Sequence, residues 1–323
     1  MIDVPKVELH NHLDCDLSYA AVWEIDPGVS AARYAAEFVG PPVCASLADF
    51  LTYTVGYRAL LQSERALRIA VRDAFGQLAA DGVAYAELRF APLLHTEEGL
   101  APEAVVACVA EETARQAAAT GVEAGLILCT MRHFGAEQSM ATARLVTRHG
   151  GPVYALDVAG DEAGYPLAPH VPAFAHVREA GLGITVHAGE AAGPENVREA
   201  LDSTGTRRIG HGVRSVEDPA LVARLRDERV LLEICPSSNV QTRAVPSLAA
   251  HPVDRLFRAG VPVGISTDAR AVTDVTLGEE YARLRDTFGW TREDLVRSNR
   301  AALAASFAPE DVRRRVASRL DAA

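Results

Sequence analysis

Short apolar runs alternate with segments of helical period along almost the whole chain. The runs are rich in Val, Ile and Leu and nearly continuous in apolar character, which is typical of strands buried on both faces of a sheet. We expect strands at Val7–Leu13, Val83–Phe90, Gly125–Thr130, Val153–Ala159, Gly183–His187, Arg208–Gly212, Val230–Cys235 and Val261–Thr267. The segments between them fit helices, the clearest of which run from Leu60 to Ala80, from Ala101 to Gly121 and from Glu217 to about Arg229.

Repeated strand–helix units predict the fold class. Eight of them in 323 residues predict an α/β protein with a closed (β/α)8 TIM barrel, forming a single domain over residues 1–323. The alternative is a doubly wound open sheet, but no Gly-x-Gly-x-x-Gly turn follows the first strand. Residues 14–57 form a long insertion after that strand, which would serve either as a lid over the strand ends or as a structural flap.

The composition argues against several classes of protein. With 49% hydrophobic residues the chain can bury a sizeable core, and its net charge of −11 disfavours nonspecific binding to nucleic acid or anionic membrane. The five cysteines are scattered and odd in number, so they predict neither a disulfide framework nor a thiolate metal site. No secretory signal or membrane-spanning run is visible. We therefore expect a cytoplasmic protein with no membrane or nucleic-acid partner.

Polar residues gather where the predicted strands end, which is where barrel enzymes carry their chemistry. His10 and His12 lie on one face of the first strand because side chains at i and i+2 point the same way. Together with His187 and Asp268, at the ends of the fifth and eighth strands, they can converge on one divalent ion, for which zinc is suited. Each residue alone has an ordinary structural explanation, but their shared position predicts a metal site.

Two further residues suit acid–base work beside such a site. Glu190 lies three residues beyond His187, and a carboxyl group partly shut off from water can hold a proton to donate. It could equally be a helix-start carboxylate stabilised by the helix dipole. His211, flanked by two glycines, could hydrogen-bond the attacking water or simply belong to a tight turn.

Several separated segments resemble the signature segments of the adenosine deaminase family, which belongs to the metal-dependent amidohydrolase superfamily. They are residues 5–14 (PKVELHNHLD), 187–190 (HAGE), 209–212 (IGHG) and 266–268 (STD). Residues 129–133 and 157–162 also look similar to that family. The resemblance runs in register from about Pro5 to about Phe307, which is nearly the whole chain.

The resemblance implies a role for each matching residue. One group would bind one divalent metal ion per chain, most simply Zn²⁺: His10, His12, His187 and Asp268. Glu190 would protonate the purine ring nitrogen beside the amino-bearing carbon, and His211 and Asp268 would orient and deprotonate the attacking water. Asp14 would hold a ribose hydroxyl, and the backbone of Gly160 would contact the purine ring. The implied activity is hydrolytic deamination of adenosine or 2′-deoxyadenosine to inosine or 2′-deoxyinosine, with release of ammonia.

Two departures from the family pattern affect the expected substrate. Cys15 stands where the family commonly has Gly, and Ala269 stands where many members have a second Asp that bonds the five-membered ring of the purine. Recognition of the base must therefore differ, and 6-aminodeoxyfutalosine of the futalosine menaquinone pathway is an alternative substrate. Free adenine is less favoured because Asp14 offers a sugar contact.

Two other classes of protein compete with a deaminase. A two-metal ester or amide hydrolase would share the histidines, but it usually needs a lysine on the fourth strand, where residues 156–158 read Leu-Asp-Val. A barrel that had lost catalysis would be expected to lose a metal ligand or the proton donor, and all five of those positions are intact.

Overall fold

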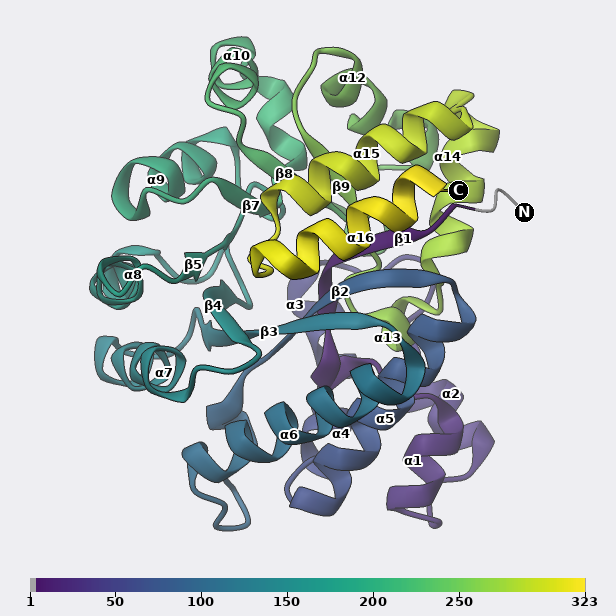
Figure 1. Cartoon of the computed structure of the whole chain (residues 1–323), viewed down its shortest axis with the longest axis vertical. Coiled ribbons are helices and arrows are strands. Elements are labelled where there is room, and N and C mark those ends of the chain that lie inside the picture. The colour runs from purple at the N-terminus through teal and green to yellow at the C-terminus, as the bar shows by residue number, and fades with distance from the viewer. Residues whose placement is uncertain (1–3, 323) are drawn as a thin grey trace.

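The computed structural model describes residues 4–322, in which parallel strands are surrounded by helices (Figure 1). The strands of this part of the chain are β1 (Lys6–His12), β2 (Val83–Phe90), β3 (Glu123–Met131), β4 (Val153–Ala159), β5 (Gly183–Ile184), β6 (Val186–Ala188), β7 (Arg208–His211), β8 (Leu231–Ile234) and β9 (Val263–Ile265). They pair in chain order as two parallel sheets, β1 to β5 and β6 to β9. The predicted α/β barrel is confirmed.

The two sheets meet at two seams. At the first, Gly183–His187 is split into β5 and β6 by Thr185, so the single fifth strand that we expected is wrong in detail. The Thr185 N–H still bonds to Leu156 O across 3.0 Å, while its hydroxyl donates to buried Glu233 across 2.9 Å. At the second seam, His12 N donates to Asp268 O across 2.9 Å, and Asp268 N donates to His10 O across 3.0 Å. This short bridge places Asp268 directly beside the two histidines of β1.

Helices cover the outside of the barrel. They are α1 (Tyr19–Ile25), α2 (Ala31–Glu37), α3 (Leu47–Phe50), α4 (Val55–Leu60), α5 (Glu64–Ala80), α6 (Pro102–Thr120), α7 (Ala136–His149), α8 (Val171–Glu179), α9 (Pro194–Thr204), α10 (Pro219–Asp227), α11 (Pro236–Gln241), α12 (Val253–Arg258), α13 (Arg270–Thr273), α14 (Leu277–Phe288), α15 (Arg292–Ala305) and α16 (Glu310–Ala322). The helix expected from Leu60 begins at Glu64 instead, because Ser63 caps it by accepting a hydrogen bond from Ala66 N.

The two ends of the barrel are closed differently. Helices α15 and α16, the yellow ribbons that cross the strands in Figure 1, pack on residues near the strand starts such as Val7, Tyr85 and Leu231. The opposite end, where the strands finish, leaves a pocket. Leu47, Phe50 and other residues of the 14–57 insertion line that pocket. Among residues 4–322, no helix is both long and apolar enough to cross a membrane.

Candidate active site

Four side chains from the first, middle and last parts of the barrel meet beside the pocket. His10 and His12 of β1, His187 of β6 and Asp268 after β9 each offer a ligand atom, and these atoms lie within 4.8 Å of one another. Asp268 Oδ1 lies 3.4 Å from His10 Nε2 and 3.3 Å from His12 Nε2. His10 Nε2 is buried and has no hydrogen-bond partner. Three imidazoles and a carboxylate around such an orphaned nitrogen fit a divalent ion such as zinc.

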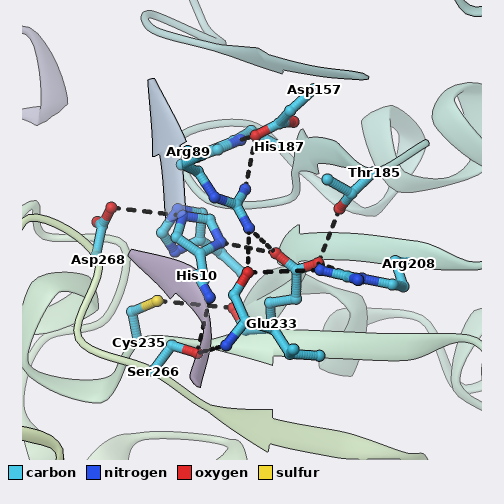
Figure 2. A network of polar contacts seen from close by, with 12 residues as sticks. His10, Arg89, Asp157, Thr185, His187, Arg208, Glu233, Cys235, Ser266 and Asp268 are labelled. Atoms are coloured by element: carbon cyan, nitrogen blue, oxygen red, sulfur yellow. Dashed lines mark hydrogen bonds and ion pairs between the residues drawn. The ribbon is translucent and has the colours of Figure 1, made fainter. Parts of the chain in front are cut away.

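Buried acids orient two of these imidazoles from behind (Figure 2). Glu233 Oε2 lies 2.9 Å from His10 Nδ1, and Asp157 Oδ2 lies 2.9 Å from His187 Nδ1. Since a carboxylate accepts, each Nδ1 carries the hydrogen and each Nε2 keeps its lone pair for a metal. Arg89 joins the two acids, with one guanidinium nitrogen 2.6 Å from Asp157 and another 2.6 Å from Glu233.

Glu190 and His211 face each other beside the four-ligand group. His211 Nε2 lies 3.5 Å from Glu190 Oε2, and the Thr242 hydroxyl donates to Glu190 Oε1 across 3.0 Å. Burial, with the negative charge of Asp268 nearby, raises the pKa of Glu190 well above the ordinary value. The raised pKa favours the protonated form of Glu190, and this residue lines the pocket.

The loop that carries Glu190 is held by one carboxylate. Glu162 accepts four backbone N–H bonds, 2.7 Å from Gly189, 3.0 Å from Glu190, 3.0 Å from Ala191 and 3.1 Å from Ala192. Glu162 is itself buried, so these four hydrogen bonds compensate its negative charge and also pair the backbone N–H groups of the loop. The sequence showed Glu162 only as part of a family-like segment and gave no sign of this contact.

His211 and Asp268 share an unusual backbone conformation. Their φ angles are +60° and +68°, in the left-handed region that residues other than glycine rarely adopt. Such strain costs roughly 1–3 kcal/mol per residue and clusters at functional sites. The Ser238 hydroxyl holds Asp268 in place by donating to its Oδ2 across 2.6 Å. Burial opposes ionisation of Asp268, but the neighbouring imidazole of His10 lowers its pKa well below the usual range.

A pocket lies above these groups. Both residues expected to touch the substrate, Asp14 and Gly160, line it. Gly160 has φ +103°, a conformation that favours glycine at this wall. Cys15 also lines the pocket, whereas Ala269 is buried outside the lining.

Asp14 is supported on one side only. Its Oδ2 accepts a hydrogen bond from Ala91 N across 3.1 Å and lies 3.4 Å from His95 Nε2. Within residues 4–322, its Oδ1 has only the Cys15 thiol, at 3.9 Å. One carboxylate oxygen is thus anchored, while the other has little competition for a hydroxyl donor. The sequence patterns had singled out neither His95 nor the contact of Cys15.

The barrel and this site together define an enzyme of the metal-dependent hydrolase class. The family model described as adenosine deaminase matches residues 5–323. The adenosine deaminase of Mycobacteroides abscessus is 39% identical and aligns with 96% of this chain and 92% of its own length. The chain therefore belongs to the adenosine deaminase family.

Solved structures agree with this assignment. The adenine deaminase of Arthrobacter aurescens is 26% identical, covers 99% of both chains and has a TM-score of 0.91. An amidohydrolase of Burkholderia ambifaria, solved with bound Zn, is 22% identical and has a TM-score of 0.89 over 99% of this chain and 91% of that one. At that identity the second likeness concerns the fold alone.

Proposed function

We propose that this chain is a zinc-dependent deaminase of an adenosine-type nucleoside, which converts adenosine or 2′-deoxyadenosine to the inosine form and ammonia. The observation that carries the proposal is the buried Glu190, whose pKa is raised, beside the His and Asp cluster in one pocket of a chain of this family. Binding of a metal alone would not need a buried acid with a raised pKa. Hydrolytic removal of an amino group uses such an acid, because a proton on the ring nitrogen makes the amino-bearing carbon electrophilic enough for attack by water.

Each side chain then has one task. One Zn²⁺ would be held by His10, His12, His187 and Asp268, and when bound it would supply the Lewis acidity that makes water nucleophilic at neutral pH. Glu190 gives its proton to the ring nitrogen beside the amino-bearing carbon. His211 and Asp268 orient the attacking water, and Asp268 is the anionic group able to take its proton. The amino group leaves as ammonia after it takes the proton held by Asp268, and the added hydroxyl returns its proton to Glu190 as the ring carbonyl forms.

The sugar side of the pocket favours a nucleoside over a free base. Asp14 Oδ1 is available to a ribose hydroxyl, and the backbone at Gly160 lies close enough to the pocket to touch the purine ring. The 14–57 insertion contributes apolar side chains to the pocket lining, namely Leu47, Phe50 and Leu51. We therefore assign that insertion the role of a lid. The relative named adenosine deaminase is also more similar to this chain than the adenine deaminase is.

The same proposal covers location and partners. All five cysteines are buried free thiols, which suits a reducing cytoplasm, and the net charge of −11 suits a small-molecule substrate better than nucleic acid.

A substrate panel tests the proposal. Protein loaded with Zn²⁺ should release ammonia from adenosine or 2′-deoxyadenosine with loss of adenine absorbance, and a chelator should abolish this until Zn²⁺ is restored. Adenine and 6-aminodeoxyfutalosine belong in the same panel. Faster turnover of 6-aminodeoxyfutalosine than of adenosine would mean that the substrate is a nucleoside with a larger group at the 5′ position. A loaded protein that turns over no aminopurine would contradict the proposal, and two tightly bound ions per chain would favour the two-metal hydrolase.

A further inference from the structure

A chain of hydrogen bonds with assignable directions leads to the imidazole of His211. It begins at the backbone of α12, where Val253 N lies 3.0 Å from His251 Nδ1. A backbone N–H can only donate, so this nitrogen of His251 is an acceptor. Burial lowers the pKa of His251 to about 3, so the ring is neutral and its one hydrogen lies on Nε2.

The next step fixes the orientation of an amide. His251 Nε2 lies 3.3 Å from Asn239 Oδ1, and Asn239 Nδ2 lies 3.0 Å from His211 Nδ1. His251 Nε2–H therefore donates to the amide oxygen, which leaves the amide nitrogen to donate to His211. Reversing the Asn239 amide would set its NH₂ group against the N–H of His251 and leave two buried donors facing each other, which is unfavourable.

The tautomer of His211 follows from these contacts. Its Nδ1 accepts from Asn239, so a neutral ring carries its hydrogen on Nε2, the nitrogen that lies 3.5 Å from Glu190 Oε2. The ring is neutral because a protonated Nδ1 could not accept a hydrogen bond from the amide nitrogen of Asn239. His211 is thus a hydrogen-bond donor toward the pocket.

We propose that His251 and Asn239 are positioning residues that present His211 to the reaction as an Nε2–H donor. This inference rests on the proposed deaminase function and sharpens it. An imidazole with its Nε2 already protonated cannot accept the proton of the attacking water, so that proton goes to Asp268. His211 instead stabilises the negative charge that grows on the attacking oxygen. Neither His251 nor Asn239 needs to touch the substrate.

Asn239→Asp tests this chain of hydrogen bonds, the relay from His251 through Asn239 to His211. The substitution keeps the shape of the side chain and reverses the direction of its hydrogen bond with His211. A carboxylate accepts from both neighbours, so the hydrogen of His211 moves to Nδ1 and Nε2 loses its donor. A wrong tautomer of a catalytic imidazole costs about 10⁴-fold in kcat in the serine protease triad. Here we expect kcat to fall about 10²–10⁴-fold, with the KM for adenosine and the zinc content close to those of the wild type.

His251 offers a matched pair of variants should Asn239→Asp fold poorly. His251→Gln retains an N–H donor for Asn239 and should keep most of kcat, whereas His251→Leu lacks it and should lose about tenfold or more. A role in packing alone predicts the opposite order or equal losses, and that result would overturn the inference.

A readout independent of turnover is nitrogen NMR of ¹⁵N-histidine-labelled, metal-free protein. His211, assigned by loss of its signals in His211→Asn, should show a protonated Nε2 and a bare Nδ1, and Asn239→Asp should reverse this. A protonated Nδ1 in the wild type would overturn the relay. A wild type that deaminates nothing would contradict the proposed function, while the spectrum would still decide the tautomer.

Discussion

Thr242 donates a hydrogen bond from its hydroxyl to Oε1 of Glu190 across 3.0 Å, and both side chains are buried. This contact occupies one oxygen of the acid and leaves Oε2, which lies 3.5 Å from His211 Nε2, as the oxygen to carry the proton. Glu190→Gln removes that proton without changing the shape. We expect kcat to fall about 10²–10⁴-fold, the usual contribution of a positioned acid. Ammonia release measures this, and metal analysis should show unchanged zinc.

The same pair predicts a pH dependence. The active form of Glu190 is neutral, so kcat should be full below its raised pKa and should fall as pH rises through that pKa. The hydrogen bond from Thr242 works against the upward shift because it stabilises the carboxylate. Thr242→Val should therefore move the alkaline limb of the kcat profile to higher pH, with Thr242→Ser as the control. If the alkaline limb stays in place in Thr242→Val, that limb does not report the ionisation of Glu190.

Much of this architecture could be predicted from the order of residues. Apolar runs gave the barrel, and the i, i+2 spacing of His10 and His12 gave half of the metal group. Asp268 could be placed beside them because its strand follows last and a closed barrel brings the last strand to the first. The break at Thr185 could not be predicted, since it depends on a hydroxyl bonding to Glu233 on another strand.

The supporting residues were less visible in the sequence, for a physical reason. Arg89 and Glu233 lie inside otherwise apolar strands, and only their burial shows that the charges must be paired. A charged residue at an inward strand position was the one available signal. Asn239 of α11, His251 and His95 act through contacts with residues of other segments, which no local pattern records.

Arg89 should be essential for stability. Arg89→Met leaves Asp157 and Glu233 buried without their ion pairs to Arg89. Breaking a buried ion pair costs about 3–5 kcal/mol. Denaturant unfolding measures this, with the exposed Arg33→Met, whose ion pair with Glu37 is worth at most about 0.5 kcal/mol, as the control. A loss below about 1 kcal/mol for Arg89→Met would refute the assignment.

The paired acids also predict a loss of stability in acid. Burial opposes ionisation of Asp157, but the imidazole of His187 and the charge of Arg89 lower its pKa below the value of about 3.9 in an unfolded chain. The stability that Asp157 contributes is therefore full above pH 4 or so and is lost as pH falls toward the lower folded pKa. Thermal unfolding between neutral and acid pH should show this decline, with the melting temperature nearly constant on the neutral side.

Asp14 and His95 predict how the enzyme reads the sugar. Asp14→Ala removes the oxygen that is available to a sugar hydroxyl, so the KM for adenosine should rise about tenfold or more, as loss of a hydrogen bond to a charged group costs about 1.5–3 kcal/mol. Substrates without the contacted hydroxyl should lose less, and 5′-deoxyadenosine beside 2′,3′-dideoxyadenosine identifies that hydroxyl. His95→Phe removes one of the two contacts to the anchored oxygen and should raise the same KM by a smaller factor, with no further effect in the Asp14→Ala background because both changes act through one carboxylate. Equal losses on every substrate would instead mean that Asp14 supports the pocket wall and does not read the sugar.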